Sequence, residues 1–176
     1  MDKRDYAIIG LLLVIIALLS YNVINVYGDS QPKVFEFSNY IVTAPAGAHY
    51  HNNSESQGFF LSDNDVYAVF AVQCNNSPVA TSGFDLVYNS LQNGSISKSD
   101  CLNMMNKGLE DNSTYIDVNI GDFKGEPEIS VVLQDNANQS RNLMMHIIKH
   151  NDKVFTVGGF MNNDTATQMY NSLILK

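Results

Sequence analysis

The sequence predicts an α+β fold class, with an N-terminal transmembrane helix followed by an antiparallel β-sheet flanked by helices. Three observations point to it: an unbroken apolar run near the start of the chain, β-favouring runs joined by short polar turns, and amphipathic patterns that occur in blocks instead of alternating with strands. The expected divisions are a cytoplasmic tip and anchor over 1–27, a short linker over 28–33 and an extracytoplasmic domain over 34–176.

Length and charge predict the transmembrane segment. Ala7 to Leu19 is wholly apolar, and no charged residue occurs from Tyr6 to Gly28. As a helix, Tyr6 to Tyr27 spans roughly 33 Å, which matches a hydrocarbon core of roughly 30 Å. Because Lys3 and Arg4 precede the run, the N-terminus is expected in the cytoplasm, with residues 7–27 in contact with the membrane.

A cleaved signal peptide is the alternative for the same segment, because an apolar run of this length also fits such a peptide. Val26-Tyr27-Gly28 is a poor but possible cleavage site. In both interpretations the remaining chain lies outside the cytoplasm. A buried soluble helix is disfavoured because the run has no polar face.

Composition narrows the classes of partner. The 176 residues include 10 basic and 18 acidic side chains, a net charge of -8, and the whole excess lies from Asp29 onward. This acidic balance argues against nucleic acid as a partner, since binding phosphates requires a basic surface. Two cysteines are too few for a disulfide scaffold or a structural zinc site.

The outer part is rich in Asn, and several of these residues open N-x-[ST] sequences, to which glycans are added outside the cytoplasm. The glycosylation candidates are Asn52, Asn75, Asn93, Asn112, Asn138 and Asn163. The alternative is that Asn-rich turns collect Ser and Thr without being modified.

The outer domain is predicted to open with strands. The runs 34–37 and 40–43 are separated by the turn pair Ser38-Asn39, and Pro45 and Gly47 end the second run.

A hairpin is predicted next, with arms over 59–61 and 66–73 on either side of the polar residues 62–65. Both faces of the second arm are apolar, which is typical of a central strand covered on both sides.

Two helices follow. Phe84, Val87, Tyr88 and Leu91 recur at helical spacing, and Asn93-Gly94 supplies a left-handed stop.

The second helix is expected to begin near Ser99. Leu102, Met105 and Leu109 form its apolar stripe, and Gly108 ends it.

Strands then return. Ile116, Val118 and Ile120 alternate with polar residues and predict a half-buried strand with these three side chains inward. Further strands are predicted over 128–134, 141–150 and 154–160, the last two joined by the turn Asn151-Asp152.

A helix closes the chain. Thr165 and Gln168 fit a capping box, and the apolar stripe that follows consists of Ala166, Met169, Tyr170 and Leu173.

This order of elements resembles the PsbP-like fold, a small antiparallel sheet flanked by helices. The resemblance is carried by the strand pair and Pro-Gly turn of Phe35 to Gly47, the hairpin after it, the long late hairpin, and the helix that closes on Asn171-Ser172-Leu173. It covers most of Val34 to Lys176 without a diagnostic motif. Tyr50 stands where such domains often have a tryptophan after the turn.

The overall plan, one apolar span plus a small Asn-rich domain, is similar to envelope proteins common in methanogenic archaea. The resemblance to PsbP-like domains implies an accessory or binding module instead of an enzyme, although a fold alone does not license a function.

Motifs that carry known chemistry are missing from the sequence. It contains no phosphate-binding or dinucleotide-binding glycine loop, no H-E-x-x-H and no G-x-S-x-G. His49 and His51 could share a metal on an extended segment, but no third ligand is near, so a solvated loop is expected. His146 is expected to be an ordinary histidine within a strand, because no partner is identifiable.

The cysteines leave three alternatives open. Cys74 and Cys101 could form a disulfide, which an outer location permits. They could also be two free buried thiols, or Cys101 could be a nucleophile at a helix N-terminus.

Two carboxylate clusters could hold Ca²⁺, Asp63-Asn64-Asp65 and Glu126-Pro127-Glu128. Because the remaining ligands of a calcium loop are missing, both are better explained as turn and edge chemistry.

We therefore expect a membrane-anchored, non-catalytic binding or accessory domain of the cell envelope. Neither a catalytic residue nor a metal ligand nor a cofactor is predicted, and the partner would be an envelope protein or polymer. One alternative is a structural protein that associates with itself. The other is an enzyme acting on envelope polymers, which requires a cleft where Cys101 or a carboxylate pair meets His146.

Overall fold

The computed structural model describes residues 31–52, 57–61, 68–107, 109, 113–136, 142–160 and 163–176. Its strands are β1 (Lys33–Glu36), β2 (Tyr40–Ala44), β3 (His49–Asn52), β4 (Gln57–Phe60), β5 (Phe70–Asn75), β6 (Ser113–Phe123), β7 (Glu126–Asp135), β8 (Asn142–His150), β9 (Lys153–Phe160) and β10 (Ile174–Leu175). Its helices are α2 (Pro78–Gln92), α3 (Lys98–Lys107) and α4 (Asp164–Ser172).

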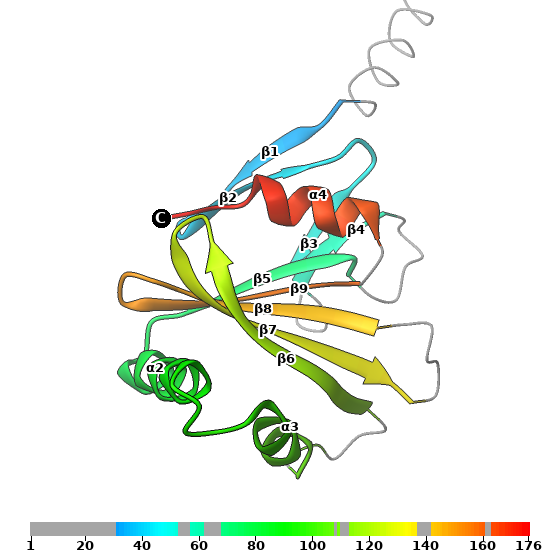
Figure 1. Cartoon of the computed structure of the whole chain (residues 1–176). Helices are drawn as coiled ribbons and strands as arrows, with labels where there is room; N and C mark the ends of the chain where they lie inside the picture. The colour runs from blue at the N-terminus through cyan, green and yellow to red at the C-terminus, as the bar shows by residue number, and fades with distance from the viewer. Residues whose placement is uncertain are drawn as a thin grey trace, which may run out of the picture.

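The strands form two antiparallel sheets. The larger has seven strands in the order β3-β4-β5-β9-β8-β7-β6, and the smaller has three in the order β1-β2-β10. In Figure 1, α2 and α3 lie below the large sheet, while α4 and the small sheet lie above it. The large sheet is therefore the middle layer, and it is covered on both faces.

Each face of the large sheet has its own core. The first core joins the sheet to α4 and the small sheet and includes Phe59, Phe155 and Met169. The second core lies against α2 and α3 and includes Phe84 and Val118. Because side chains alternate along a strand, Val154 of β9 lies in the second core and its neighbour Phe155 lies in the first.

The predicted fold class, an α+β domain preceded by a transmembrane helix, is contradicted, because the described part of the chain is mostly β and contains no membrane-spanning helix. Among the described residues no helix is both long and apolar enough to cross a membrane. The predicted membrane segment, with residues 7–27 in contact with the bilayer, lies outside them. Residues 28–30 of the predicted linker over 28–33 also lie outside, whereas its last residue, Lys33, already belongs to β1. Strands account for 50% of the described residues and helices for 27%, so the fold is mostly β.

Two strands were not expected from the sequence. Residues 49–52, predicted as a polar loop, form β3 and pair with β4, while the last residues of the chain form β10 and pair with β2. In β3 the one large apolar side chain, Tyr50, packs against Phe37 and Phe59 at ring-centroid distances of 4.9 and 5.1 Å. Neither strand has a hydrophobic repeat long enough to predict it from the sequence. Both strands form because they pair with a neighbouring strand.

The strand predicted around Ile116 is present as β6, and Val118 and Ile120 point into the second core as predicted, but Ile116 does not. A register shift between Tyr115 and Asp117 turns Tyr115 toward the second core and leaves Ile116 43% exposed. Asn106 of α3 holds the irregularity, since its side chain accepts from the Tyr115 N–H at 2.7 Å and donates to the Tyr115 carbonyl at 2.9 Å. A bulge of this kind shifts side chains between the faces of a sheet.

The cap of α4 is also different from the prediction. Asn163 is the N-cap residue, because its side chain accepts from the Ala166 N–H at 3.1 Å, and Thr165 lies inside the helix. At the other end, Lys124 donates to the carbonyls of Asn171 and Leu173, both at 2.8 Å. Both ends of α4 are thus held by side chains, as unpaired helix ends require.

Candidate functional site

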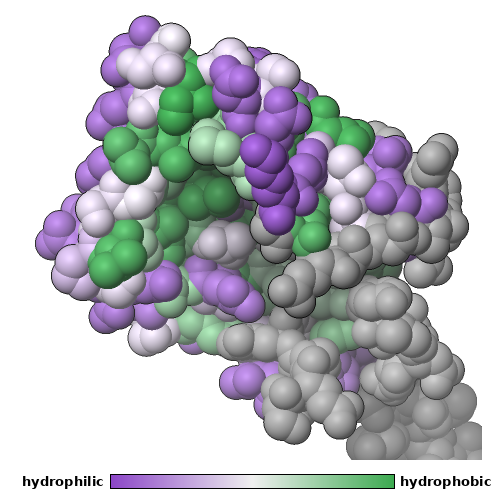
Figure 2. Space-filling view, turned by 90° about the horizontal axis from the view of Figure 1, so that it is seen from below, coloured by the Kyte–Doolittle hydropathy of each residue, from purple (hydrophilic) through white to green (hydrophobic). Residues whose placement is uncertain are grey.

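Two cavities, one on each face of the large sheet, are the candidate sites. The first, here called the α2–α3 cavity, has a volume of about 500 Å³. It is lined by Phe84 and Val87 of α2, Met104 and Met105 of α3, and sheet residues including Ile129 and Ile147. Figure 2 views this face from the side of α2 and α3 and shows apolar side chains gathered around a hollow.

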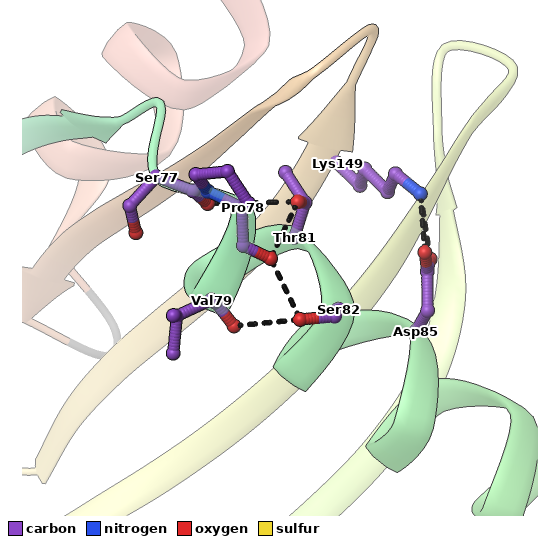
Figure 3. Close-up of polar contacts among 7 residues, drawn as sticks. All are labelled: Ser77, Pro78, Val79, Thr81, Ser82, Asp85 and Lys149. Atoms are coloured by element: carbon purple, nitrogen blue, oxygen red, sulfur yellow. Dashed lines mark hydrogen bonds and ion pairs between the residues drawn. The ribbon is translucent and has the colours of Figure 1, made fainter.

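Side chains at the start of α2 and along it determine where the helix begins and how it is joined to the sheet. Ser77 caps the helix by accepting from the Ala80 N–H, and Pro78 occupies its first turn, where a missing N–H costs nothing. Farther along, Lys149 of β8 forms an ion pair with Asp85 at 2.6 Å (Figure 3). The pair joins α2 to β8, although it is too exposed to add much stability.

Cys101 belongs to the α2–α3 cavity and is not activated. Its Sγ lies 3.9 Å from Met105 Sδ, and burial raises the pKa of its thiol. A nucleophilic cysteine requires a lowered pKa, so this environment is that of an apolar, unreactive thiol.

The second cavity, here called the α4 cavity, lies between α4 and strands β5, β8 and β9 and has a volume of about 370 Å³. Its walls are mostly apolar, with Phe70, Met144 and Val157 from the sheet. Two titratable side chains also line it, His146 and Tyr170.

These two side chains share one buried carboxylate. Glu128 is only 7% exposed, and its Oε1 pairs with Nδ1 of His146 while its Oε2 accepts from the Tyr170 hydroxyl at 3.1 Å. The His146 and Tyr170 rings are stacked, with centroids 4.0 Å apart. Burial, the charge of Glu128 and the hydrogen bond to it all raise the pKa of Tyr170.

The arrangement gives His146 a partner that the sequence alone did not reveal. Ser130 is the direct cross-strand partner of His146 and Ile148 that of Glu128, so the pair is diagonal on one face of the sheet. One signal in the sequence could have indicated this contact. Side chains alternate along β7, so Glu128 lies on the same face of the sheet as Ser130, the residue opposite His146. A second pair of the same kind, His150 Nδ1 with Glu126 Oε1 at 2.9 Å, lies beside it.

The structure does not bring the two cysteines together. Both thiols are free, and they lie on opposite faces of the large sheet, Cys74 against the first core and Cys101 in the second. Burial raises the pKa of Cys74 as well, although the charge of Lys153 opposes this. The same separation keeps Cys101 away from His146, so the Cys–His arrangement predicted for an enzyme has no geometric basis. The carboxylate arrangement is present in part, because Glu128 of the Glu126-Pro127-Glu128 cluster pairs with His146.

The sequon asparagines fall into two groups. Asn112 and Asn138 lie outside the described residues. Asn52, Asn75 and Asn93 are exposed, and Asn163 is half-buried as the α4 cap. The Oδ1 atoms of Asn75 and Asn93 each accept from the backbone N–H two residues on, which is the turn chemistry that such residues provide without modification.

The other metal candidates do not form a metal centre in the described part of the chain, and the carboxylates Glu126 and Glu128 pair with histidines instead. Asp63-Asn64-Asp65 lies outside the described residues, and His51 packs edge-on against Phe60 at a centroid distance of 5.1 Å. Among the described side chains, no three His, Cys, Asp or Glu groups are placed to hold a metal ion.

The predicted resemblance to the PsbP-like fold, a small antiparallel sheet flanked by helices, is confirmed for the fold by a solved structure. The solution structure of cyanobacterial PsbP (CyanoP) from Synechocystis sp. PCC 6803 matches this chain with a TM-score of 0.55 and 12% identity. The match covers 84% of this chain and 94% of that one, and at this identity it shows the fold alone. No family model and no curated protein sequence matches.

Proposed function

We propose that this chain is a non-catalytic binding domain of the cell envelope that works outside the cytoplasm and holds an apolar, uncharged group of its ligand in the α2–α3 cavity. The observation that carries the proposal is the lining of that cavity. None of the described side chains that line it is charged, and its volume of about 500 Å³ falls in the range of small-molecule sites.

The methionines that line the α2–α3 cavity also favour an apolar ligand. Met104 is 54% exposed at the cavity although it is a large apolar residue, and Met105 lies beside it. Methionine side chains adapt to irregular apolar ligands. The apolar lining disfavours a charged group of either sign, and the net charge of -8 additionally repels an anion, so an uncharged ligand is favoured.

The proposed location rests on the sequence. The apolar run Ala7–Leu19 has the length of an export signal, and the acidic, Asn-rich remainder suits an outer domain. Protease added to intact cells should digest residues 31–176. A domain that survives in intact cells but is digested after lysis would contradict the location.

The ligand site is tested with an uncharged apolar probe. The full chain, labelled with ¹³C at its methionine methyl groups, is titrated with N-phenyl-1-naphthylamine and followed by NMR. We expect the Met104 and Met105 signals to shift while the signals of Met144 and Met169, on the other face, stay in place. Shifts confined to Met144 and Met169, or no shift, would contradict the proposal.

Gly83 provides the matched variants. It lies in α2 at the cavity, and a Cβ added there meets no atom within 4 Å, so a side chain has room. Gly83→Phe should fill the cavity and weaken probe binding by at least tenfold. Gly83→Ala improves helix propensity without filling the space and should bind the probe as the wild type does.

A further inference from the structure

The α4 cavity is a second site with different chemistry from the α2–α3 cavity. We propose that it binds a small apolar molecule bearing one hydroxyl group, with His146 Nε2 as the acceptor for that hydroxyl. The proposal depends only on the geometry of this cavity and stands whether or not the α2–α3 cavity binds a ligand.

Glu128 determines which nitrogen of His146 is left for a ligand. A carboxylate only accepts hydrogen bonds, so the proton between Glu128 and His146 is assigned to Nδ1. In the neutral imidazole this leaves Nε2 as an acceptor. Among the described residues, the imidazole of His146 makes one hydrogen bond, to Glu128, and one ring stack, on Tyr170, and neither uses Nε2.

The imidazole is held in place before any ligand arrives. Its Nδ1 is fixed by a carboxylate that is itself fixed by the Tyr170 hydroxyl, and its face is stacked on the Tyr170 ring. Tyr170 in turn packs against Phe123 at a centroid distance of 4.9 Å. A preorganised acceptor loses little freedom on binding, which favours affinity.

The rest of the cavity suits an apolar body. Phe70, Met144 and Val157 form its walls, and Gly159 allows α4 to lie close to β9. A Cβ on Gly159 would lie 2.9 Å from the Cβ of Ala166, so this approach requires glycine. The cavity volume of about 370 Å³ accommodates a ligand of one ring with substituents.

The test compares two probes of nearly equal shape, p-cresol and toluene, which differ by the hydroxyl group. The full chain with ¹³C-labelled histidine rings is titrated with each probe and followed by NMR. We expect p-cresol to shift the His146 ring signals and to bind about tenfold more tightly than toluene, which is the effect of one well-placed hydrogen bond. His146→Phe should keep the apolar walls and bind both probes equally.

A second pair of variants covers the case in which His146→Phe fails to fold. Thr167 is exposed on α4 and lines the cavity, whereas Gln168 is exposed beside it and does not. Thr167→Phe should block p-cresol, and Gln168→Phe should leave its binding unchanged. Equal binding of the two probes by the wild type, no shift at His146, or equal binding by the two α4 variants would overturn the proposal.

Discussion

At the scale of single residues, Glu128 is the most consequential side chain. A buried carboxylate is stable only if its oxygens accept hydrogen bonds, and here one oxygen accepts from a histidine and the other from a tyrosine. The cost of burying Glu128 is therefore offset by partners from two other elements, β8 and α4. This links the integrity of the α4 cavity to the docking of α4.

The raised pKa of Tyr170 predicts a loss of stability at alkaline pH. An unfolded phenol titrates near about 10, and the fold favours its neutral form, so stability falls as the pH rises above about 10. Tyr170→Phe should lower the free energy of unfolding at pH 8 by about 1–3 kcal/mol, because the hydrogen bond to Glu128 is lost. Between about pH 9 and 11 the free energy of unfolding of this variant should decrease less steeply than that of the wild type. Urea unfolding at each pH measures both effects.

Tyr88→Phe is the matched control, since Tyr88 stacks on Phe84 on the opposite face and does not contact Glu128. Tyr88→Phe should lose as much stability at alkaline pH as the wild type does. Parallel pH dependence in wild type and Tyr170→Phe would show that Tyr170 does not carry the effect.

At the scale of elements, the N-cap of α4 is Asn163 in the structure, whereas the sequence predicted Thr165. Asn163→Ala removes the side chain that accepts from the Ala166 N–H and should destabilise the protein by about 1 kcal/mol. Thr165→Ala, at the position that the sequence favoured as the cap, should change stability by less than about 0.5 kcal/mol. Urea unfolding of protein made without glycosylation checks both, and a larger loss for Thr165→Ala would place the cap at Thr165.

Most elements could be predicted because their signals are local. The stripe of Phe84, Val87, Tyr88 and Leu91 specified α2, and Asn151-Asp152 specified the turn between β8 and β9. The inward face of β6 was predicted correctly at Val118 and Ile120 but not at Ile116. Alternation placed Ile116 inside, but the register shift that Asn106 holds from another element exposes it.

At the scale of the whole molecule, the large sheet separates two cores, and the methionines of the helices that cover them differ in burial. Met169 of α4 is fully buried in the first core, whereas Met104 of α3 is 54% exposed at the α2–α3 cavity. Met169→Ala should therefore cost about 2–5 kcal/mol, and Met104→Ala less than about 0.5 kcal/mol. Denaturant unfolding of the two variants compares them directly, and similar losses would contradict this difference in burial.

The sequence by itself determined the acidic charge, most of the strands and helices and the order that resembles a PsbP-like domain. These follow from composition, turn residues and hydrophobic spacing, which act over a few residues. Only the tertiary structure decided which side chains meet. Glu128 is 18 residues from His146 and 42 from Tyr170, and the cysteines that the sequence could pair lie on opposite faces of one sheet. The reason is physical: strand register and helix docking set such contacts, and neither is encoded in the local repeat.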